Sequence, residues 1–261
     1  MLVISMQMAI HEDESKDIYI ERANDYLQHI YDDNIHPVQI IFPEMWTVGF
    51  WAFDQYKVKA EPQYGPVYDL LSFWAKKFSC YIHTGSFVES DMGKFYNTSL
   101  LLDPNGNVIG KYRKIHLFSY KSKEAEILSP GSSIAVFSTE YGKVGMATCY
   151  DLRFPELFRI MSRFGCEYFL ISSSWPIERI KHWELFNKAR AVENQCFTIS
   201  CNAVGVNGGA QLGGHSMITS PCGDVLCTGA LSEGYILCEI NTGDITEYRT
   251  SFPILADRHI F

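Results

Sequence analysis

Short, continuously apolar segments alternate along the chain with longer segments whose apolar residues recur every three or four positions. An uninterrupted apolar run predicts a strand buried on both faces, and the longer spacing predicts a helix with one buried face. The predicted strands cover residues 2–8, 38–42, 81–88, 144–148, 168–172 and 197–202. The predicted helices cover residues 15–31, 66–78 and 181–194, with another beginning near Pro155. This alternation indicates sheets that helices cover on at least one face.

Two hairpins interrupt the alternation. Residues 97–102 and 108–112 flank an Asp-Pro-Asn-Gly turn, in which the Asn-Gly pair accepts positive φ. A second hairpin joins residues 215–219 to residues 225–228. Because a hairpin pairs its strands antiparallel, we expect mixed sheets. The two halves of the chain share a similar order of elements, which predicts an α/β sandwich of two packed sheets with helices outside.

The composition predicts an ordered globular protein. No low-complexity segment and no block of charge divides the 261 residues, so we expect one domain over residues 1–261. The content of 47% apolar and 20% charged residues is that of a typical domain. The net charge of -8 argues against a nucleic-acid partner, which calls for a basic face. Since no run of about eighteen apolar residues occurs, we also expect no membrane span.

The cellular compartment follows from the first residues and the cysteines. The opening MLVISM lacks the basic segment, apolar stretch and small-residue cleavage site of a secretory signal, so we expect a cytoplasmic protein. The eight cysteines include no Cys-x-x-Cys pair, which favours reduced thiols and argues against a metal site. Asn97-Thr98-Ser99 matches a glycosylation sequon, which we interpret as a chance match in a protein that is not secreted.

Three of the apolar strands lead into reactive side chains. Glu44 follows the strand near residue 40, Lys114 follows the first hairpin, and Cys149 follows residues 144–148. Binding sites of α/β sheets gather beyond the carboxyl ends of strands, so the three groups can converge. A thiol becomes a nucleophile when a base removes its proton, which Glu44 can do. Lys114 and backbone N–H groups beside Cys149 can stabilise an oxyanion, an effect of ~2.7–4 kcal/mol per donor.

Each of these residues also has an ordinary structural interpretation. A cysteine is more often a small buried apolar residue than a nucleophile. A glutamate after a strand is usually a solvated turn residue, and Lys114 stands close to Lys111 and Arg113, as in an exposed basic face. The spacing alone therefore leaves an acyl-transfer site as one hypothesis among several.

Five segments, in order, resemble those of the nitrilase (carbon–nitrogen hydrolase) superfamily. Three resemble its signature segments, and two resemble its later landmarks, so that the likeness covers nearly the whole chain. The segments are residues 42–44 (FPE), 112–118 (YRKIHLF), 149–157 (CYDLRFPEL), 182–195 (HWELFNKARAVENQ) and 214–217 (GHSM). The resemblance implies a four-layer α-β-β-α sandwich and a catalytic triad of Glu44, Lys114 and Cys149.

The same resemblance implies a second glutamate that positions the lysine and the substrate. Glu124, seven residues before Gly131, matches this position best. Neighbouring Glu126 is the alternative, and either residue would otherwise be an ordinary surface charge. The histidines of the matching segments, His116, His182 and His215, are expected to be structural.

The substrate is expected to touch Tyr150, Arg153 and Trp175. Arg153 follows the nucleophile by four residues, and a guanidinium binds carboxylates through two hydrogen bonds. Members of the superfamily that act on ω-amides of dicarboxylic acids resemble this segment, which favours an anionic amide. The alternatives are an ion pair of Arg153 with Asp151 or Glu156, and a plain core position for Trp175. The aromatic residues 45–51 are expected to shape access to the site.

The resemblance thus implies an enzyme that hydrolyses a small amide through a thioester on Cys149 and releases ammonia, with no cofactor and no metal. Hydrolysis of a nitrile or an N-carbamoyl group on the same triad is the second interpretation. A non-catalytic binding or scaffold protein is the third, although all three triad residues are present. Residues 252–259 resemble the tail with which family members cross a neighbouring subunit, so a homodimer is expected.

Overall fold

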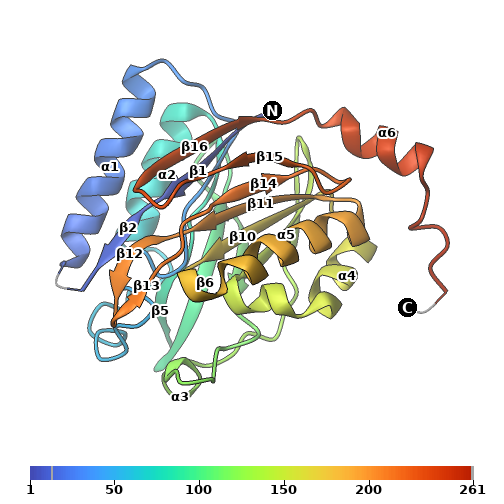
Figure 1. Cartoon of the computed structure of the whole chain (residues 1–261). Helices are drawn as coiled ribbons and strands as arrows, with labels where there is room; N and C mark the ends of the chain where they lie inside the picture. Colours follow the sequence, from blue (N-terminus) through green and yellow to red (C-terminus); the bar gives the residue numbers. More distant parts are fainter. Residues whose placement is uncertain (13, 260–261) are drawn as a thin grey trace.

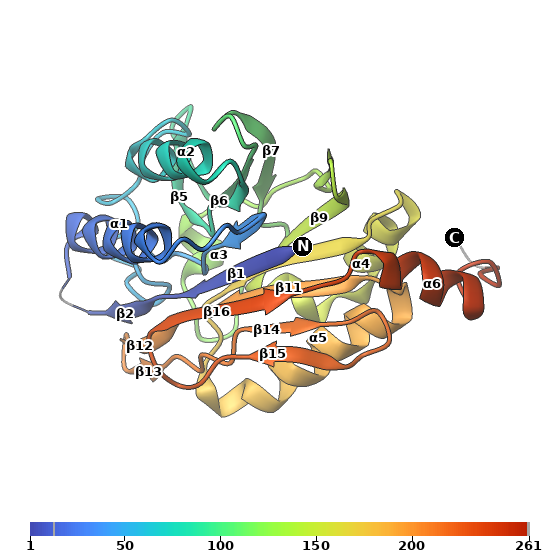
Figure 2. The same cartoon turned by 90° about the horizontal axis from the view of Figure 1, so that it is seen from above.

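Two mixed β-sheets pack face to face, and helices cover the outer face of each. The structure, a computed structural model, describes residues 1–12 and 14–259. Seen from above, helices α1 and α2 lie on one side of the paired sheets and α4 and α5 on the other (Figure 2). This arrangement confirms the expected α-β-β-α sandwich of four layers.

The first sheet has seven strands in the order β16-β1-β3-β4-β6-β5, with β7 also paired to β6. Strands β1, β3 and β4 run parallel, whereas β16 joins β1 antiparallel and β6 joins β4 antiparallel. Its strands are β1 (Leu2–Gln7), β3 (Gln39–Ile41), β4 (Tyr81–His83), β5 (Phe87–Asp91), β6 (Lys94–Leu102), β7 (Val108–Arg113) and β16 (Gly234–Glu239). Its two helices are α1 (Lys16–Asp32) and α2 (Pro66–Phe78).

The second sheet has six strands in the order β15-β14-β11-β10-β9-β8. Its three central strands are parallel and its flanking pairs are antiparallel, so this sheet is also mixed, as predicted. The strands are β8 (Val136–Thr139), β9 (Gly142–Thr148), β10 (Tyr168–Ser173), β11 (Phe197–Asn202), β14 (Met217–Thr219) and β15 (Val225–Thr228). The helices on this side are α4 (Pro155–Arg163) and α5 (Ile180–Asn194).

Smaller elements lie at the ends of the sandwich. A three-stranded sheet joins the two halves of the chain, because β2 pairs parallel with β12. The remaining elements are β2 (Ala9–His11), β12 (Val204–Asn207), β13 (Ala210–Gln211), α3 (Glu124–Ile127), the 3₁₀ helices η1 (Cys149–Arg153) and η2 (Ile177–Arg179), and α6 (Gly243–Ser251). Helix α6 and residues 252–259 extend beyond the layers (Figure 1).

Alternation of side chains along the strands divides the core into layers. In β1, Ile4 packs with the α1 and α2 side of the sheet, and its neighbour Val3 packs between the sheets. In β10, Leu170 faces the other sheet and Ile171 faces α4 and α5. Because successive strand residues point to opposite faces, a sheet covered on both faces needs an uninterrupted apolar run. The runs seen in the sequence have this cause.

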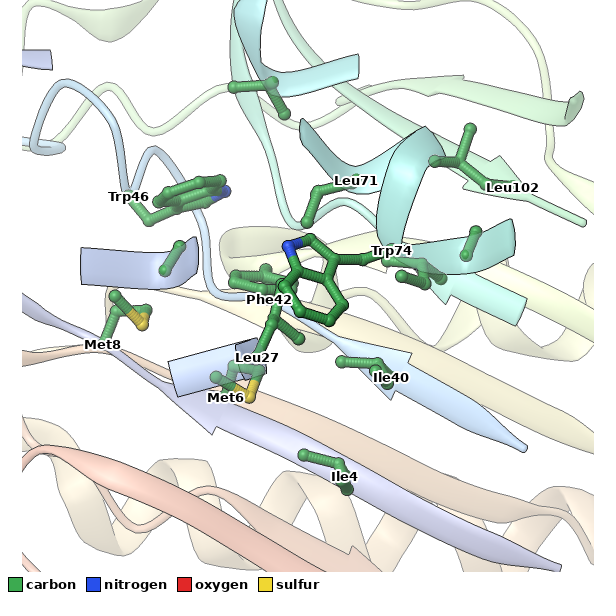
Figure 3. Packing of buried hydrophobic residues seen from close by; sticks show 14 of the residues in the cluster. Ile4, Met6, Met8, Leu27, Ile40, Phe42, Trp46, Leu71, Trp74 and Leu102 are labelled. Atoms are coloured by element: carbon green, nitrogen blue, oxygen red, sulfur yellow. The ribbon is translucent and has the colours of Figure 1, made fainter. Parts of the chain in front are cut away.

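The layer under α1 and α2 is rich in aromatic side chains. Figure 3 shows the Trp74 indole among side chains from α1, β1 and β3, with Phe42 and Trp46 nearby. The rings of Phe42 and Trp46 lie 5.1 Å apart. Both residues flank Glu44 in the sequence, so this core fixes the backbone on either side of a predicted catalytic residue.

The structure departs from the sequence prediction in one strand. The segment over residues 81–88, predicted as one strand, forms β4 and the start of β5 instead. Gly85 between them has a φ of +67°, and a Cβ atom there would lie 2.2 Å from the Pro43 carbonyl oxygen. The chain therefore bends at Gly85 so that the segment leading to Glu44 can pass close to its backbone.

Strand β16 and helix α6 are among the elements that were not predicted. Strand β16 completes the edge of the first sheet by pairing with β1, and its short apolar run, residues 235–238, was not recognised as a strand. Helix α6 has a single buried residue, Ile245. Among the described residues, no helix is long and apolar enough to cross a membrane.

Candidate active site

The ends of three strands bring Glu44, Lys114 and Cys149 into one place, as the sequence predicted. Glu44 follows β3, Lys114 follows β7, and Cys149 follows β9. The Lys114 ammonium donates a 2.8 Å hydrogen bond to Glu44 Oε1, and both side chains are fully buried. Burial and, after it, the charge of Glu44 raise the pKa of the Cys149 thiol, as expected for a buried thiol beside this carboxylate.

Glu124 forms the other side of the lysine site. Its Oε1 and Oε2 lie 3.1 and 3.0 Å from Lys114 Nζ, and Oε2 also accepts a 2.7 Å hydrogen bond from the Phe118 backbone N–H. Glu124 is fully buried, whereas Glu126 is exposed. Of the two glutamates that the sequence left open, the structure therefore brings Glu124 into contact with Lys114.

The Asn97 side chain bridges the carboxylates of Glu44 and Glu124, a role that the sequence analysis did not predict. Its side-chain N–H₂ group donates to Glu44 Oε1 at 3.0 Å and to Glu124 Oε1 at 2.9 Å. Its backbone carbonyl accepts from Lys114 N at 2.9 Å. The side chain is 1% exposed, which agrees with the interpretation of the sequon as a chance match. A polar residue inside the apolar strand β6 was the available signal.

Glu44 is also held from the second sheet. Its Oε2 accepts a 3.0 Å hydrogen bond from the Ser174 backbone N–H, and its backbone carbonyl accepts one of 2.7 Å from the Ser174 hydroxyl. Ser174 follows β10, so each sheet contributes to the position of this carboxylate. With Lys114, Asn97 and Ser174 as donors, the orientation of Glu44 is fixed before any substrate binds.

Cys149 occupies a strained turn between β9 and η1. Its φ is +48°, in the left-handed region that residues other than glycine seldom adopt. Asp151 stabilises this turn, because its Oδ2 accepts a 2.9 Å hydrogen bond from the Thr148 backbone N–H. The turn starts the short helix η1 at Cys149, and the first backbone N–H groups of a helix have no partner within it.

The buried charges of this cluster influence one another. Burial opposes the charged form of Lys114, but the carboxylates of Glu124 and Glu44 outweigh burial and raise its pKa. Burial and the nearby charge of Glu44 raise the pKa of Glu124, against the effect of Lys114. Burial, followed by the charge of Glu44, raises the pKa of the Cys149 thiol. At neutral pH the resting site therefore holds a protonated lysine and a protonated thiol.

A pocket opens onto Cys149. It holds about 350 Å³ of empty space, counting its open mouth. All three residues predicted to contact substrate, Tyr150, Arg153 and Trp175, line it. The other lining residues are Phe50, Trp51, Phe118, Cys149, Ser174, Pro176 and Arg179. The prediction that residues 45–51 shape the access is consistent with Phe50 and Trp51 in this wall.

Arg153 forms no ion pair with Asp151 or Glu156. Over the described part of the chain, no carboxylate lies within 4.0 Å of its guanidinium. The guanidinium lies instead over the Trp175 ring, 4.6 Å from the ring centre, with His182 Nδ1 3.5 Å away. The alternative of a structural ion pair is therefore wrong, and the charge of Arg153 remains available to a ligand.

The model of the carbon-nitrogen hydrolase family matches residues 5–250. The chain belongs to the carbon–nitrogen hydrolase family. It is 33% identical to 2-oxoglutaramate amidase of Paenarthrobacter nicotinovorans in an alignment 264 residues long that covers 98% of this chain and 88% of that protein. It is also 33% identical to omega-amidase NIT2 of Homo sapiens in an alignment 229 residues long that covers 84% of this chain and 82% of the relative.

A solved structure supports the same assignment. The crystal structure of Saccharomyces cerevisiae Nit3, a member of branch 10 of the nitrilase superfamily, matches this carbon–nitrogen hydrolase with a TM-score of 0.90 and 28% sequence identity. The match covers 100% of this chain and 97% of that chain. The resemblance inferred from five sequence segments is thus confirmed, and so is the fold that it implied.

The histidines of this carbon–nitrogen hydrolase lie outside the catalytic cluster. His116 Nδ1 lies 2.7 Å from Asp151 Oδ1, and its ring stacks on Phe154 at 3.8 Å between ring centres. His215 Nδ1 lies 3.2 Å from Glu184. Across residues 1–12 and 14–259, no group of three or more His, Cys, Asp or Glu side chains is arranged to hold a metal ion.

Proposed function

We propose that this chain, acting as one unit over residues 1–261, hydrolyses a small amide that carries a carboxylate at its far end, and releases ammonia. The observation on which the proposal rests is the buried Lys114 between Glu44 and Glu124, next to the Cys149 thiol at a pocket that contains an unpaired arginine. Relatives named 2-oxoglutaramate amidase and omega-amidase support this substrate class.

The first half-reaction forms a thioester. Cys149 Sγ attacks the amide carbonyl carbon while Glu44 takes the thiol proton, because the raised pKa of the thiol keeps it protonated until a base acts. An ammonium has three N–H donors, and the two oxygens of Glu124 lie at nearly equal distances from Lys114 Nζ, as in a shared hydrogen bond. Two donors then suffice for both carboxylates, and the third can stabilise the oxyanion.

Collapse of the tetrahedral adduct completes the thioester, because Glu44 passes its proton to the amide nitrogen, the C–N bond breaks, and ammonia leaves. The second half-reaction releases the acid. Glu44, again a carboxylate, takes a proton from water, whose oxygen attacks the thioester carbonyl. The C–S bond then breaks, the carboxylic acid departs, and the proton returns to Cys149. Glu124 and Asn97 do not transfer protons in this scheme but hold Lys114 and Glu44 in place.

Mass spectrometry of the enzyme with a panel of small amides tests the proposal. An acyl group is expected on Cys149 of the wild type, with ammonia as the other product. The Cys149→Ala variant is expected to keep its circular dichroism spectrum and lose ammonia release by at least about 1,000-fold. A substrate panel that yields carbon dioxide would indicate carbamoyl hydrolysis, and preference for a nitrile would indicate a nitrilase. Absence of any acyl adduct would contradict the proposal in favour of a binding protein.

We also propose that the enzyme is a homodimer. The support comes from two exposed apolar side chains, Ile160 on α4 at 40% and Phe164 directly after α4 at 59% exposure, and from the position of α6 and residues 252–259 outside the layers (Figure 1). An isologous contact would bury these side chains. Phe164→Glu is expected to give a monomer in analytical ultracentrifugation, and Leu185→Glu, at an exposed position of α5, serves as the matched control. A monomeric wild type at micromolar concentration contradicts this proposal.

The proposed location is the cytoplasm. All eight cysteines are free thiols, which suits a reducing compartment. Cell fractionation followed by detection of the protein tests the location, and recovery from an oxidising compartment would contradict it.

A further inference from the structure

Two arginines share the pocket, and only one of them was expected there. Arg153 ends η1, and Arg179 ends η2, the short helix that joins β10 to α5. Both line the pocket together with Cys149, and both are partly buried. Within residues 1–12 and 14–259, neither guanidinium has a carboxylate within 4.0 Å. The pocket therefore contains two positive charges that the surrounding protein does not neutralise.

Trp175 connects the two arginines. The Arg153 guanidinium lies over the Trp175 ring, and the indole N–H of Trp175 donates a 2.9 Å hydrogen bond to the Arg179 backbone carbonyl. Trp175 itself is rigid, because it is 2% exposed and its backbone N–H donates to Asn202 Oδ1 at 2.6 Å. The backbone of η2 is thus anchored at the tryptophan on which Arg153 rests, and the Arg179 guanidinium lies 5.9 Å from the centre of the Tyr120 ring. This backbone anchor places Arg179 beside the pocket before a ligand arrives.

The positive charges of Arg153 and Arg179 make the pocket suited to binding an anion. The rest of the wall is mostly aromatic and none of its lining residues carries a carboxylate, so ring faces alone offset the positive charge. Burial lowers the pKa of Arg153, and the positive charge of Arg179 lowers it further. Two like charges in such a wall repel each other, and a bound carboxylate would remove that repulsion while gaining charge-assisted hydrogen bonds.

We propose that Arg179 determines substrate specificity by binding the distal carboxylate of the substrate together with Arg153. The inference rests on the proposed amide hydrolysis and adds a residue to it. The amide end reaches Cys149 while the carboxylate lies between the two guanidiniums, so the fitting class is the short monoamide of a dicarboxylic acid. Arg179 does not touch the reacting carbonyl and acts on affinity rather than on the chemical step.

The test compares a charged amide with a neutral one of the same shape. Succinamate carries the distal carboxylate, and 4-oxopentanamide replaces it with an acetyl group. Arg179→Gln is expected to raise KM for succinamate about 10- to 100-fold, the range of hydrogen bonds to a charged group. The kcat for succinamate, and kcat/KM for 4-oxopentanamide, are expected to stay within about threefold. A merely structural defect would impair both substrates alike.

Two further variants separate a specific contact from a general loss of charge. Lys181→Gln removes an exposed positive charge two residues from Arg179 and is expected to leave KM for succinamate unchanged. Arg179→Lys keeps the charge but cannot form bidentate hydrogen bonds with a carboxylate, so its KM for succinamate is expected to be intermediate. Equal effects of Arg179→Gln and Lys181→Gln would overturn the proposal.

Binding without turnover distinguishes this inference from the proposed function. Calorimetry on the Cys149→Ala protein measures the affinity for succinamate with and without Arg179→Gln. A loss of affinity about 10-fold or greater supports the arginine pair even if the wild type forms no acyl adduct, an outcome that contradicts only the proposed hydrolysis. Unchanged affinity, or equal affinity of the Cys149→Ala protein for succinamate and 4-oxopentanamide, overturns the role of Arg179 whatever the enzyme hydrolyses.

Discussion

The Tyr112 hydroxyl donates a 2.6 Å hydrogen bond to Asp151 Oδ2 and so joins the strand before Lys114 to the turn that contains Cys149. The same carboxylate group accepts from the Thr148 backbone N–H at 2.9 Å and from the His116 backbone N–H at 3.1 Å. Burial, followed by the charge of Asp151, raises the pKa of Tyr112 well above its ordinary value, so the phenol remains a donor. One buried carboxylate therefore fixes the spacing between the predicted lysine and the predicted nucleophile.

Removal of this link is expected to affect both stability and catalysis. Tyr112→Phe removes the hydroxyl that donates to the buried Asp151 carboxylate, and the loss of this hydrogen bond to a charged group is expected to lower the free energy of unfolding by about 1.5–3 kcal/mol. The kcat should fall more than KM changes, because Lys114 and Cys149 lose their fixed separation. Urea denaturation and an ammonia assay measure the two effects. Tyr141→Phe, at a partly exposed tyrosine, is the control, and equal behaviour of the two variants would contradict the linking role.

Substitutions of Glu124 and Glu126 are expected to have very different effects on activity. Glu124→Gln removes a charge that holds Lys114 and leaves the side chain nearly the same size, so kcat/KM is expected to fall about 100-fold through misplacement of the lysine. Glu126→Gln changes an exposed side chain and is expected to stay within about twofold. Steady-state kinetics of both variants measures the difference. If Glu126→Gln had the larger effect, the proposed supporting role would pass to that residue.

The sequence predicted those strands and site residues whose signal lies in a short, local stretch of residues. Apolar runs that end in Glu44, Lys114 and Cys149 predicted both the strands and the place where the side chains meet. Asn97 and Ser174 were not recognised, because they contact Glu44 from 53 and 130 residues away and only the pairing of sheets brings them near. The local pattern around Asn97 even suggested a different role, a glycosylation sequon.

Gly85 shows that contacts between segments distant in sequence also limited the prediction of the fold. The segment over residues 81–88 was predicted as one strand, and the bend inside it is required by a segment distant in sequence, the backbone at Pro43. Strand β16 is another case, since it belongs to the sheet through β1 at the opposite end of the chain. Close approach and long-range pairing leave little trace in hydrophobic periodicity.

The protonation state of Cys149 is the third prediction. Because burial and the charge of Glu44 raise the pKa of the thiol, it should stay neutral throughout the physiological range. The ultraviolet thiolate absorbance of the wild type minus that of Cys149→Ser is therefore expected to show no increase below about pH 9. Glu44→Gln removes a charge that raises the thiol pKa, so the increase in absorbance should occur at a lower pH in this variant. An increase in the wild type below about pH 7 would contradict general-base activation by Glu44.

His83 makes the stability of the fold depend on pH. The side chain is fully buried in β4, and its Nδ1 accepts a 3.1 Å hydrogen bond from the Gly85 backbone N–H, which requires a neutral ring nitrogen. Its own carbonyl accepts a 3.1 Å bond from Phe42 N, close to Glu44. Burial lowers the pKa of the imidazole from about 6.5 to about 3. Between these values the unfolded chain binds a proton that the folded protein excludes.

The free energy of unfolding should therefore increase with pH through this window. The contribution of His83 is fully present above about pH 6.5 and is lost as the pH falls toward 3, at about 1.4 kcal/mol per pH unit. Between pH 6.5 and pH 5 the wild type is expected to lose about 2 kcal/mol more than His83→Asn, whose side-chain oxygen can still accept from Gly85 N–H. Urea denaturation at a series of pH values measures the two slopes. Equal slopes, or an NMR titration of the His83 ring above about pH 6, would show that the imidazole is not kept neutral by burial.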